Sequence, residues 1–88
     1  DLVIEGAGGV LVPLNDTDFV IDIALKFQAQ IILVSNVYLG SINHTLLTAR
    51  ELERRGATVR GIIFNRAGNP ATEDIILKHT GYQCLLKI

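Results

Sequence analysis

The 88-residue chain contains no methionine and no tryptophan, and it has a single cysteine, Cys84. One cysteine cannot form a disulfide within the chain, which favours a reducing compartment such as the cytoplasm. Charged residues make up only 19% of the sequence, and the net charge is −1. Because such a chain carries no basic surface field, we expect no nucleic-acid partner.

Long apolar runs are also missing. The longest, residues 31–34, is far shorter than the roughly 20 residues that a helix needs to cross a bilayer, so we expect no membrane partner. The apolar fraction is nevertheless 49%, which excludes intrinsic disorder. A chain of this length has room for one small domain or part of a larger one. Since both ends are apolar and no initiator methionine is present, we expect residues 1–88 to be part of a single domain.

Short apolar runs alternate with helical patterns along the chain. The runs cover residues 2–4, 31–34 and 59–64, with a weaker fourth run at 84–86. These runs are rich in apolar residues and do not alternate with polar ones, although Arg60 and Gly61 interrupt the third. Such runs are typical of parallel strands covered by helices on both faces. The sequence therefore predicts an α/β fold in the order β-α-β-α-β-α-β, with right-handed crossovers.

Three helices are predicted between these strands from their capping residues and apolar spacing. Their predicted bounds are Asp16 or Asp18 to Gln28, Ser41 to Gly56, and Pro70 to Gly81. The second helix should bury one apolar face, formed by Ile42, Leu46, Ala49 and Leu52. Its polar side carries a Glu51/Arg55 pair at the spacing of an intrahelical ion pair.

A glycine-rich segment, residues 5–9, directly follows the first predicted strand. Ligands of open α/β sheets bind beyond the carboxyl ends of the strands, and glycines let backbone N–H groups approach a phosphate. Glu5 could hold Mg²⁺ there, directly or through water. The same residues would also suit a tight turn with a solvated glutamate. The sequence contains no GxxxxGKS/T phosphate-binding loop.

The segment 36–44 joins the second predicted strand to the second helix. Gly40 and Ser41 place free N–H groups at a helix start, which favours a carboxylate or a phosphate. Asn43 and His44 could add side-chain donors; the alternative is an ordinary cap with both side chains in water. No second residue has the spacing needed to make His44 a metal ligand.

Asn65 ends the third predicted strand, and Arg66 follows it. An asparagine amide offers both a donor and an acceptor, the pair needed to read the edge of an adenine ring. The alternative is that Asn65 stabilises its own turn. The sequence shows no nucleophile paired with a base, so covalent catalysis has no candidate.

Taken together, three segments resemble the dethiobiotin synthetase family. EGAGG (residues 5–9), followed by VPLN (12–15), is similar to the family's EGAGG…VPL element. LGSINHTLLT (39–48) is similar to its LGxINHxLLT element, and GIIFN (61–65) to the strand that ends in its adenine-reading asparagine. The segments follow the family's order and cover nearly the whole chain, and the second is the most specific.

The resemblance implies a three-layer, P-loop NTPase-like fold with a mostly parallel sheet and helices on both faces. It implies a cytoplasmic homodimer that uses ATP and Mg²⁺ to join 7,8-diaminononanoate and CO₂ (or bicarbonate) into the ureido ring of dethiobiotin. A carbamate forms on one amine, ATP phosphorylates it, and the second amine displaces phosphate. The family's phosphate-binding loop and its catalytic lysine are absent from these residues, so we expect no catalytic residue here and no turnover by this chain alone.

The resemblance also assigns roles by matched position. Glu5 would be a Mg²⁺ ligand. The nucleotide would be bound by Glu5, Gly6, Ala7, Gly8, Asn65 and Arg66. The substrate carboxylate would be received, across a dimer interface, by Leu39, Gly40, Ser41, Ile42 and Asn43.

One strand of the resembled fold is expected to be missing. In proteins of this class, the strand that feeds the phosphate-binding loop lies between those predicted at 2–4 and 31–34, so these two should not pair with each other. Two alternative functions remain: a cobalamin-pathway amidase or synthetase of the same fold, which fits the INH helix start less well, and a ParA-like regulatory ATPase. The latter would need a membrane-targeting helix or a basic patch, and the sequence offers neither.

Overall fold

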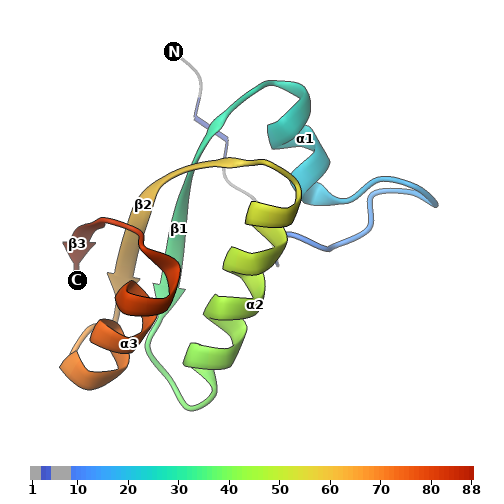
Figure 1. Cartoon of the computed structure of the whole chain (residues 1–88). Helices are drawn as coiled ribbons and strands as arrows, with labels where there is room; N and C mark the ends of the chain where they lie inside the picture. Colours follow the sequence, from blue (N-terminus) through green and yellow to red (C-terminus); the bar gives the residue numbers. More distant parts are fainter. Residues whose placement is uncertain (1–2, 5–8) are drawn as a thin grey trace.

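The computed structural model describes residues 3–4 and 9–88. One sheet holds three parallel strands in the order β1-β2-β3 (Figure 1). The strands are β1 (Gln30–Asn36), β2 (Thr58–Asn65) and β3 (Cys84–Lys87). The helices are α1 (Val20–Lys26), α2 (Ser41–Arg54) and α3 (Pro70–Thr80). The predicted α/β class and parallel sheet are confirmed.

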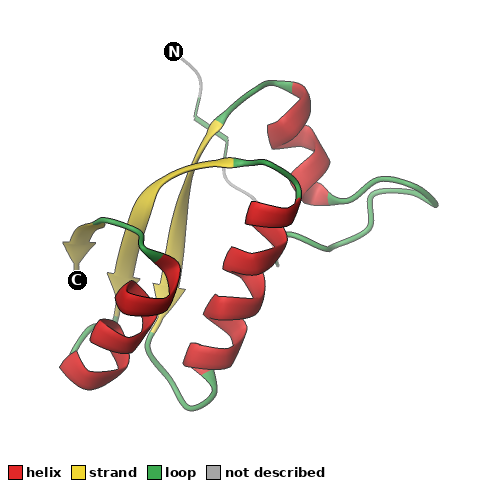
Figure 2. Cartoon of the chain, in the orientation of Figure 1, coloured by secondary structure: helices red, strands yellow, loops and turns green. Residues whose placement is uncertain are grey.

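Helices α2 and α3 lie on the same face of the sheet (Figure 2). Each joins two neighbouring parallel strands, and successive right-handed crossovers in one direction place both helices on one side. Of the three layers expected, the described residues therefore form two, the sheet and the layer of α2 and α3. The opposite face is open at Ile32 and Val34 of β1, whose exposed fractions are 49% and 58%.

The core lies between the sheet and these two helices. Ile62 and Phe64 of β2 and Ile76 of α3 are completely buried and pack together, with Cys84 against them as a partly buried neighbour. Burying such side chains completely contributes about 1.5–3 kcal/mol each. The middle strand, β2, therefore supplies most of the apolar anchor that holds the sheet to its helices.

The start and the buried face of α2 differ from the prediction. The N-cap position belongs to Gly40, not Ser41, and its φ of 89° is left-handed. The buried residues of the helix are Ser41, Thr45, Ala49 and Leu52, while Ile42 and Leu46 are only half-buried. The face is rotated because a buried hydrogen bond of 2.7 Å joins the hydroxyls of Thr45 and Ser35, the latter on β1.

The other ends of α2 and α3 agree with the prediction. Gly56 and Gly81 follow these helices with φ of 71° and 70°, a conformation that costs a side-chain-bearing residue about 1–2 kcal/mol. Pro70 is the first residue of α3, and Asn69 caps the helix by accepting the Thr72 N–H at 3.2 Å. These local signals are reliable because each acts within one turn of chain.

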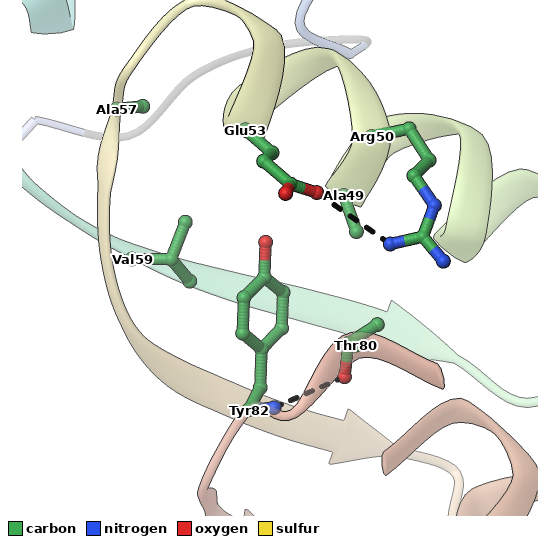
Figure 3. A pocket seen from close by; sticks show the side chains of 7 residues that line it. All are labelled: Ala49, Arg50, Glu53, Ala57, Val59, Thr80 and Tyr82. Atoms are coloured by element: carbon green, nitrogen blue, oxygen red, sulfur yellow. Dashed lines mark hydrogen bonds and ion pairs between the residues drawn. The ribbon is translucent and has the colours of Figure 1, made fainter. Parts of the chain in front are cut away.

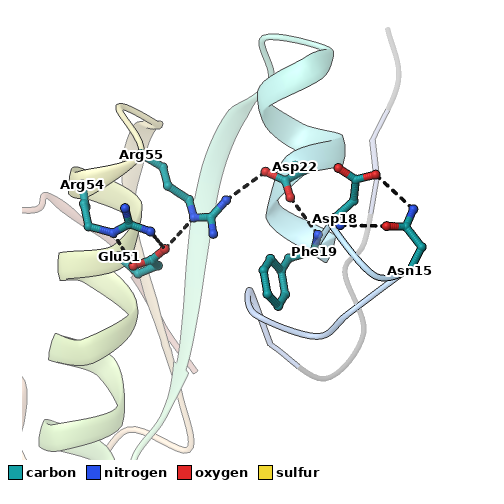
Figure 4. Close-up of polar contacts among 7 residues, drawn as sticks. All are labelled: Asn15, Asp18, Phe19, Asp22, Glu51, Arg54 and Arg55. Atoms are coloured by element: carbon teal, nitrogen blue, oxygen red, sulfur yellow. Dashed lines mark hydrogen bonds and ion pairs between the residues drawn. The ribbon is translucent and has the colours of Figure 1, made fainter.

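Helix α1 begins after Phe19, so the predicted caps Asp16 and Asp18 are wrong. Asn15 Oδ1 accepts the Asp18 N–H at 2.8 Å, and Asn15 Nδ2 donates to the Asp18 carboxylate at 3.0 Å. Asp18 is thereby held in the turn before the helix. The Phe19 N–H instead donates to the Asp22 carboxylate at 2.7 Å (Figure 4), which satisfies a free donor at the helix start.

The strand predicted over residues 2–4 does not form in the described part of the chain. Val3 and Ile4 are exposed and have no strand conformation, and residue 2 lies outside the described residues. Extended segments in a sheet are stabilised by hydrogen bonds to a neighbour, and β1 pairs only with β2 among the described residues. No ladder therefore joins residues 3–4 to β1, as the missing-strand hypothesis predicts.

Arg55 links the end of α2 to α1. Its Nε donates to Glu51 Oε2 at 2.5 Å, and its Nη1 donates to Asp22 Oδ1 at 2.9 Å (Figure 4). The predicted Glu51/Arg55 pair is thus confirmed. Arg54 adds bonds of 2.9 and 2.6 Å to the same carboxylate. Hydrogen bonds from Arg54 and then Arg55 lower the pKa of Glu51 from its ordinary 4.5 to about 2.

We predict that Glu51 makes stability acid-dependent. Because its pKa is lower in the folded state, Glu51 stabilises the fold fully above pH 4.5, and this contribution is lost as the pH falls toward about 2. Urea unfolding at several pH values should show that Glu51→Gln lowers the free energy of unfolding most near neutrality and progressively less below pH 4.5. Asp16→Asn, in an exposed turn, is the control. A difference between Glu51→Gln and the original chain that does not change with pH would contradict this prediction.

Candidate functional site

The carboxyl ends of the three strands lie beside the starts of α2 and α3 (Figure 1). Ligands of open α/β sheets bind at this edge. Asn36 and Asn65, the last residues of β1 and β2, are register partners, and Lys87 ends β3. The fold thus gathers polar side chains from three segments that are distant in sequence.

A cavity of about 410 Å³ opens beside the end of β1. Its walls come from the end of the glycine-rich segment, from β1 and from the first turns of α2. The lining residues are Gly9, Leu33, Val34, Ser35, Asn36, Tyr38, His44, Thr45 and Thr48. The structure therefore brings Gly9, the last residue of the EGAGG element, close to the LGSINHTLLT element, a proximity that the sequence could suggest only through the family resemblance.

Tyr38 and His44 form a pair in the wall of this cavity. The Tyr38 hydroxyl lies 2.5 Å from His44 Nδ1, and the two ring centres are 5.7 Å apart. The bond joins the loop after β1 to the first turn of α2. Sequence reasoning missed this role for Tyr38, because a separation of six residues across a loop matches no regular spacing.

The start of α2 has free backbone donors. The His44 N–H donates to the Gly40 carbonyl at 3.1 Å, whereas the N–H groups of Ile42 and Asn43 have no acceptor among the described residues. Leu39 and the Asn43 side chain are exposed beside them. Free N–H groups at the positive end of a 14-residue helix favour an anionic group.

Ser41 adds a second unusual feature at this helix start. Its side chain is 1% exposed, and its Oγ has no hydrogen-bond partner among the described residues. An unsatisfied buried polar group costs about 1–3 kcal/mol. The Ser41 hydroxyl is therefore a buried hydrogen-bond donor, in the first turn of α2, that has no acceptor among the described residues.

We predict that Ser41→Ala keeps or increases stability. Removing an unpartnered hydroxyl should raise the free energy of unfolding by up to about 1–3 kcal/mol, whereas Thr45→Ala, which breaks the bond to Ser35, should lower it by about 1 kcal/mol. Urea unfolding of the two variants provides a matched comparison, since both hydroxyls lie on the buried face of α2. A loss as large for Ser41→Ala as for Thr45→Ala would contradict the prediction.

Asn65 is held across the end of the sheet. Its Nδ2 donates to Asn36 Oδ1 at 2.9 Å, and its carbonyl accepts the Val37 N–H at 3.2 Å. An amide has two N–H donors and one carbonyl oxygen, so one donor and the acceptor have no partner among the described residues. Arg66, the next residue, is exposed and has a left-handed φ of 58°. Sequence reasoning assigned no role to Asn36.

The remaining predicted positions, Glu5, Gly6, Ala7 and Gly8, lie outside the described residues, and with them the predicted metal ligand. Within residues 3–4 and 9–88, no group of three or more His, Cys, Asp or Glu side chains could hold a metal ion. No helix in that part of the chain is long and apolar enough to cross a membrane.

A second cavity, of about 360 Å³, lies near the amino ends of β2 and β3 (Figure 3). Tyr82 points toward Glu53 of α2, which forms a 3.5 Å ion pair with Arg50. Burial, and then the charge of Glu53, raise the pKa of Tyr82. None of the residues that line this second cavity belongs to the three family-like segments. The candidate site is therefore the cavity at the carboxyl end of β1.

Comparisons with known proteins show which family the chain resembles. The AAA domain family matches residues 1–88. The chain is similar to the ATP-dependent dethiobiotin synthetase BioD of Cytophaga hutchinsonii, with 67% identity over 100% of this chain and 43% of that protein. The enzyme of the same name from Christiangramia forsetii is 53% identical over 89% of this chain and 37% of that protein. The enzyme of the same name from Paramagnetospirillum magneticum is 38% identical over 99% of this chain and 42% of that protein. The chain therefore spans less than half the length of these relatives.

Proposed function

The chain belongs to the AAA domain family, with a P-loop NTPase-like fold, and on this premise we propose that it is the carboxy-proximal part of an ATP-dependent dethiobiotin synthetase. The resemblance seen in its three segments is confirmed by relatives of that name. The reaction would be the carboxylation and ring closure of 7,8-diaminononanoate with CO₂ or bicarbonate, releasing ADP and phosphate. The enzyme would be a cytoplasmic homodimer. The relatives favour neither a cobalamin-pathway enzyme nor a ParA-like ATPase.

The observation that carries this proposal is the start of α2 beside the 410 Å³ cavity. A diamino acid has one carboxylate, and the free N–H groups of Ile42 and Asn43 suit such a group. Leu39, Gly40 and Ser41 would complete this binding segment. Gly40 lets the chain turn tightly enough to leave those N–H groups open, because its φ of 89° is one that other residues rarely adopt. In the homodimer, this segment would serve the partner subunit's active site.

The nucleotide would lie along the carboxyl ends of the strands. Asn65 would read the adenine edge with its remaining donor and acceptor, and its bond to Asn36 would keep the amide in one orientation. Arg66 would add positive charge next to it. Glu5, Gly6, Ala7 and Gly8 would line the phosphates, where glycine lets backbone N–H groups come close.

Mg²⁺, when bound, would neutralise charge on the phosphates, with Glu5 as its ligand in this part of the protein. Phosphoryl transfer needs positioning and charge stabilisation more than a covalent protein group. The residues of this chain would accordingly bind and orient the substrates. The phosphate-binding loop and its lysine would come from the rest of the protein, so this chain alone should be inactive.

We also propose that residues 1–88 form one part of a single domain. The exposed Ile32 and Val34 lie on a bare face of β1, which is also an edge strand of the sheet. Apolar side chains on an edge strand favour a further packing partner. The remainder of a longer protein would supply that partner, consistent with the 43% coverage of the relative from Cytophaga hutchinsonii.

Two substitutions should separate the substrate and nucleotide sites in the whole enzyme. Asn43→Ala should raise KM for the diamino acid by about tenfold or more, since it removes a donor to a charged group, and should leave KM for ATP unchanged. Asn65→Ala should raise KM for ATP by about twofold to tenfold and leave KM for the diamino acid unchanged. His79→Ala, at the exposed far end of α3, is the control. Steady-state kinetics measure both constants; a rise in KM for ATP in Asn43→Ala would refute the assignment of α2 to the carboxylate.

The metal assignment predicts that Glu5→Gln weakens the use of Mg²⁺·ATP. A neutral amide is a poorer ligand for a hard dication than a carboxylate, so the Mg²⁺ concentration for half-maximal activity should rise several-fold. Circular dichroism should show an unchanged fold. An unaltered Mg²⁺ dependence would remove Glu5 from the metal site.

A further inference from the structure

Glu73, in the first turn of α3, is a buried carboxylate that the proposed reaction does not use. Its side chain is 2% exposed. Its Oε2 accepts the Gly68 N–H at 3.1 Å and the Asn69 N–H at 3.3 Å, and its Oε1 lies 2.8 Å from Lys87 Nζ on β3. The carboxylate thus joins the loop after β2, the start of α3 and the end of β3.

This loop, residues 66–69, immediately follows Asn65. The Ala67 N–H donates to the Ile88 carbonyl at 2.8 Å, and the Ile88 N–H donates to the Phe64 carbonyl at 2.8 Å. Arg66 and Gly68 have positive φ angles of 58° and 152°. A positive φ is unfavourable for arginine, so contacts on either side must maintain this conformation.

A general role at the helix dipole does not account for Glu73. Asp74, the next residue, is exposed in the same turn and could serve the dipole without burial, and Asn69 already caps the helix. A buried carboxylate requires compensating donors to be tolerated. Lys87 first, and then the Gly68 N–H, lower the pKa of Glu73, so it is held as the anion that can accept all three bonds.

We propose that Glu73, assisted by Lys87, is a positioning residue for the nucleotide: it fixes the loop 66–69 and thereby the presentation of Asn65 and Arg66. This inference rests on the proposed function, because it needs Asn65 and Arg66 to contact ATP. The loop is held at the carboxyl ends of β2 and β3, whereas the carboxylate-binding start of α2 makes no contact with Glu73 among the bonds of the described residues.

The size of the effect follows from the fraction of molecules with a competent loop. Without its carboxylate anchor, the strained Arg66 and the glycine at 68 can relax to other backbone conformations. If about a tenth of the molecules keep the productive loop, the apparent affinity for ATP falls about tenfold. Binding of the diamino acid should not change.

The experiment compares Glu73→Ala, Glu73→Gln and Lys87→Met in the whole enzyme, with Glu51→Ala as the matched control. Like Glu73, Glu51 is a carboxylate paired with basic side chains, here Arg54 and Arg55, but it lies in the last turn of α2. Glu73→Ala should raise KM for ATP about tenfold and reduce the preference for ATP over GTP, with KM for the diamino acid unchanged. Glu51→Ala should lower the stability of the fold and leave both KM values unchanged.

Charge and backbone contributions can be separated by a double variant. Glu73→Gln keeps an oxygen for the Gly68 and Asn69 N–H groups but strands the Lys87 ammonium. Combining Glu73→Gln with Lys87→Met removes both charges, so KM for ATP should return toward the original value. A purely structural role would lower thermal stability in all variants without moving KM for ATP.

The outcomes distinguish this inference from the proposed function. If Asn65→Ala leaves KM for ATP unchanged, the assignment of the nucleotide is wrong. If Asn65→Ala raises KM for ATP while folded Glu73→Ala and Lys87→Met do not, Glu73 is not a positioning residue and the inference is overturned. Should Glu73→Ala fail to fold, Glu73→Gln and Lys87→Met decide the question by the same comparison of KM values.

Discussion

The parallel pairing of β2 with both of its neighbours is the constraint on which the rest of the structure depends. Ile62 and Phe64 are fully buried on this strand, so its register cannot slip without exposing the core. The fixed register sets Asn36 beside Asn65 and Phe64 beside Lys87. The candidate residues that the structure describes, apart from Gly9, lie at the ends of β1 and β2, at the start of α2 or in the loops that directly follow these strands.

The sequence predicted well what depends on neighbouring residues. Runs rich in apolar residues located β1, β2 and β3, and Pro70 and Gly81 located the ends of α3, because capping acts within one turn. The prediction failed where a side-chain contact that it did not foresee competed, either within one turn or across the fold. Asp18 was expected to cap α1, but the side chain of Asn15 holds it in the preceding turn. The buried face of α2 rotated because a hydroxyl on β1 bonds to the helix.

The candidate site was only partly predictable from residues. Local patterns left each segment with an ordinary structural alternative, and the family resemblance chose between them. The structure adds what no pattern contains: the Asn36–Asn65 bond, the Tyr38–His44 pair and the burial of Glu73. Each joins side chains whose meeting depends on the tertiary fold. The sequence pattern gave no sign that Glu73 would be buried, because its partner Lys87 lies on another element, β3.

The bare face of β1 has a consequence for the behaviour of these residues in isolation. Among the described residues, β1 is an edge strand with exposed Ile32 and Val34 and with one side free of a strand partner. This is the geometry by which sheets grow between molecules. Expressed alone, the chain should self-associate as its concentration rises. Covering this face early in folding would therefore protect the longer protein from aggregation as well as complete its core.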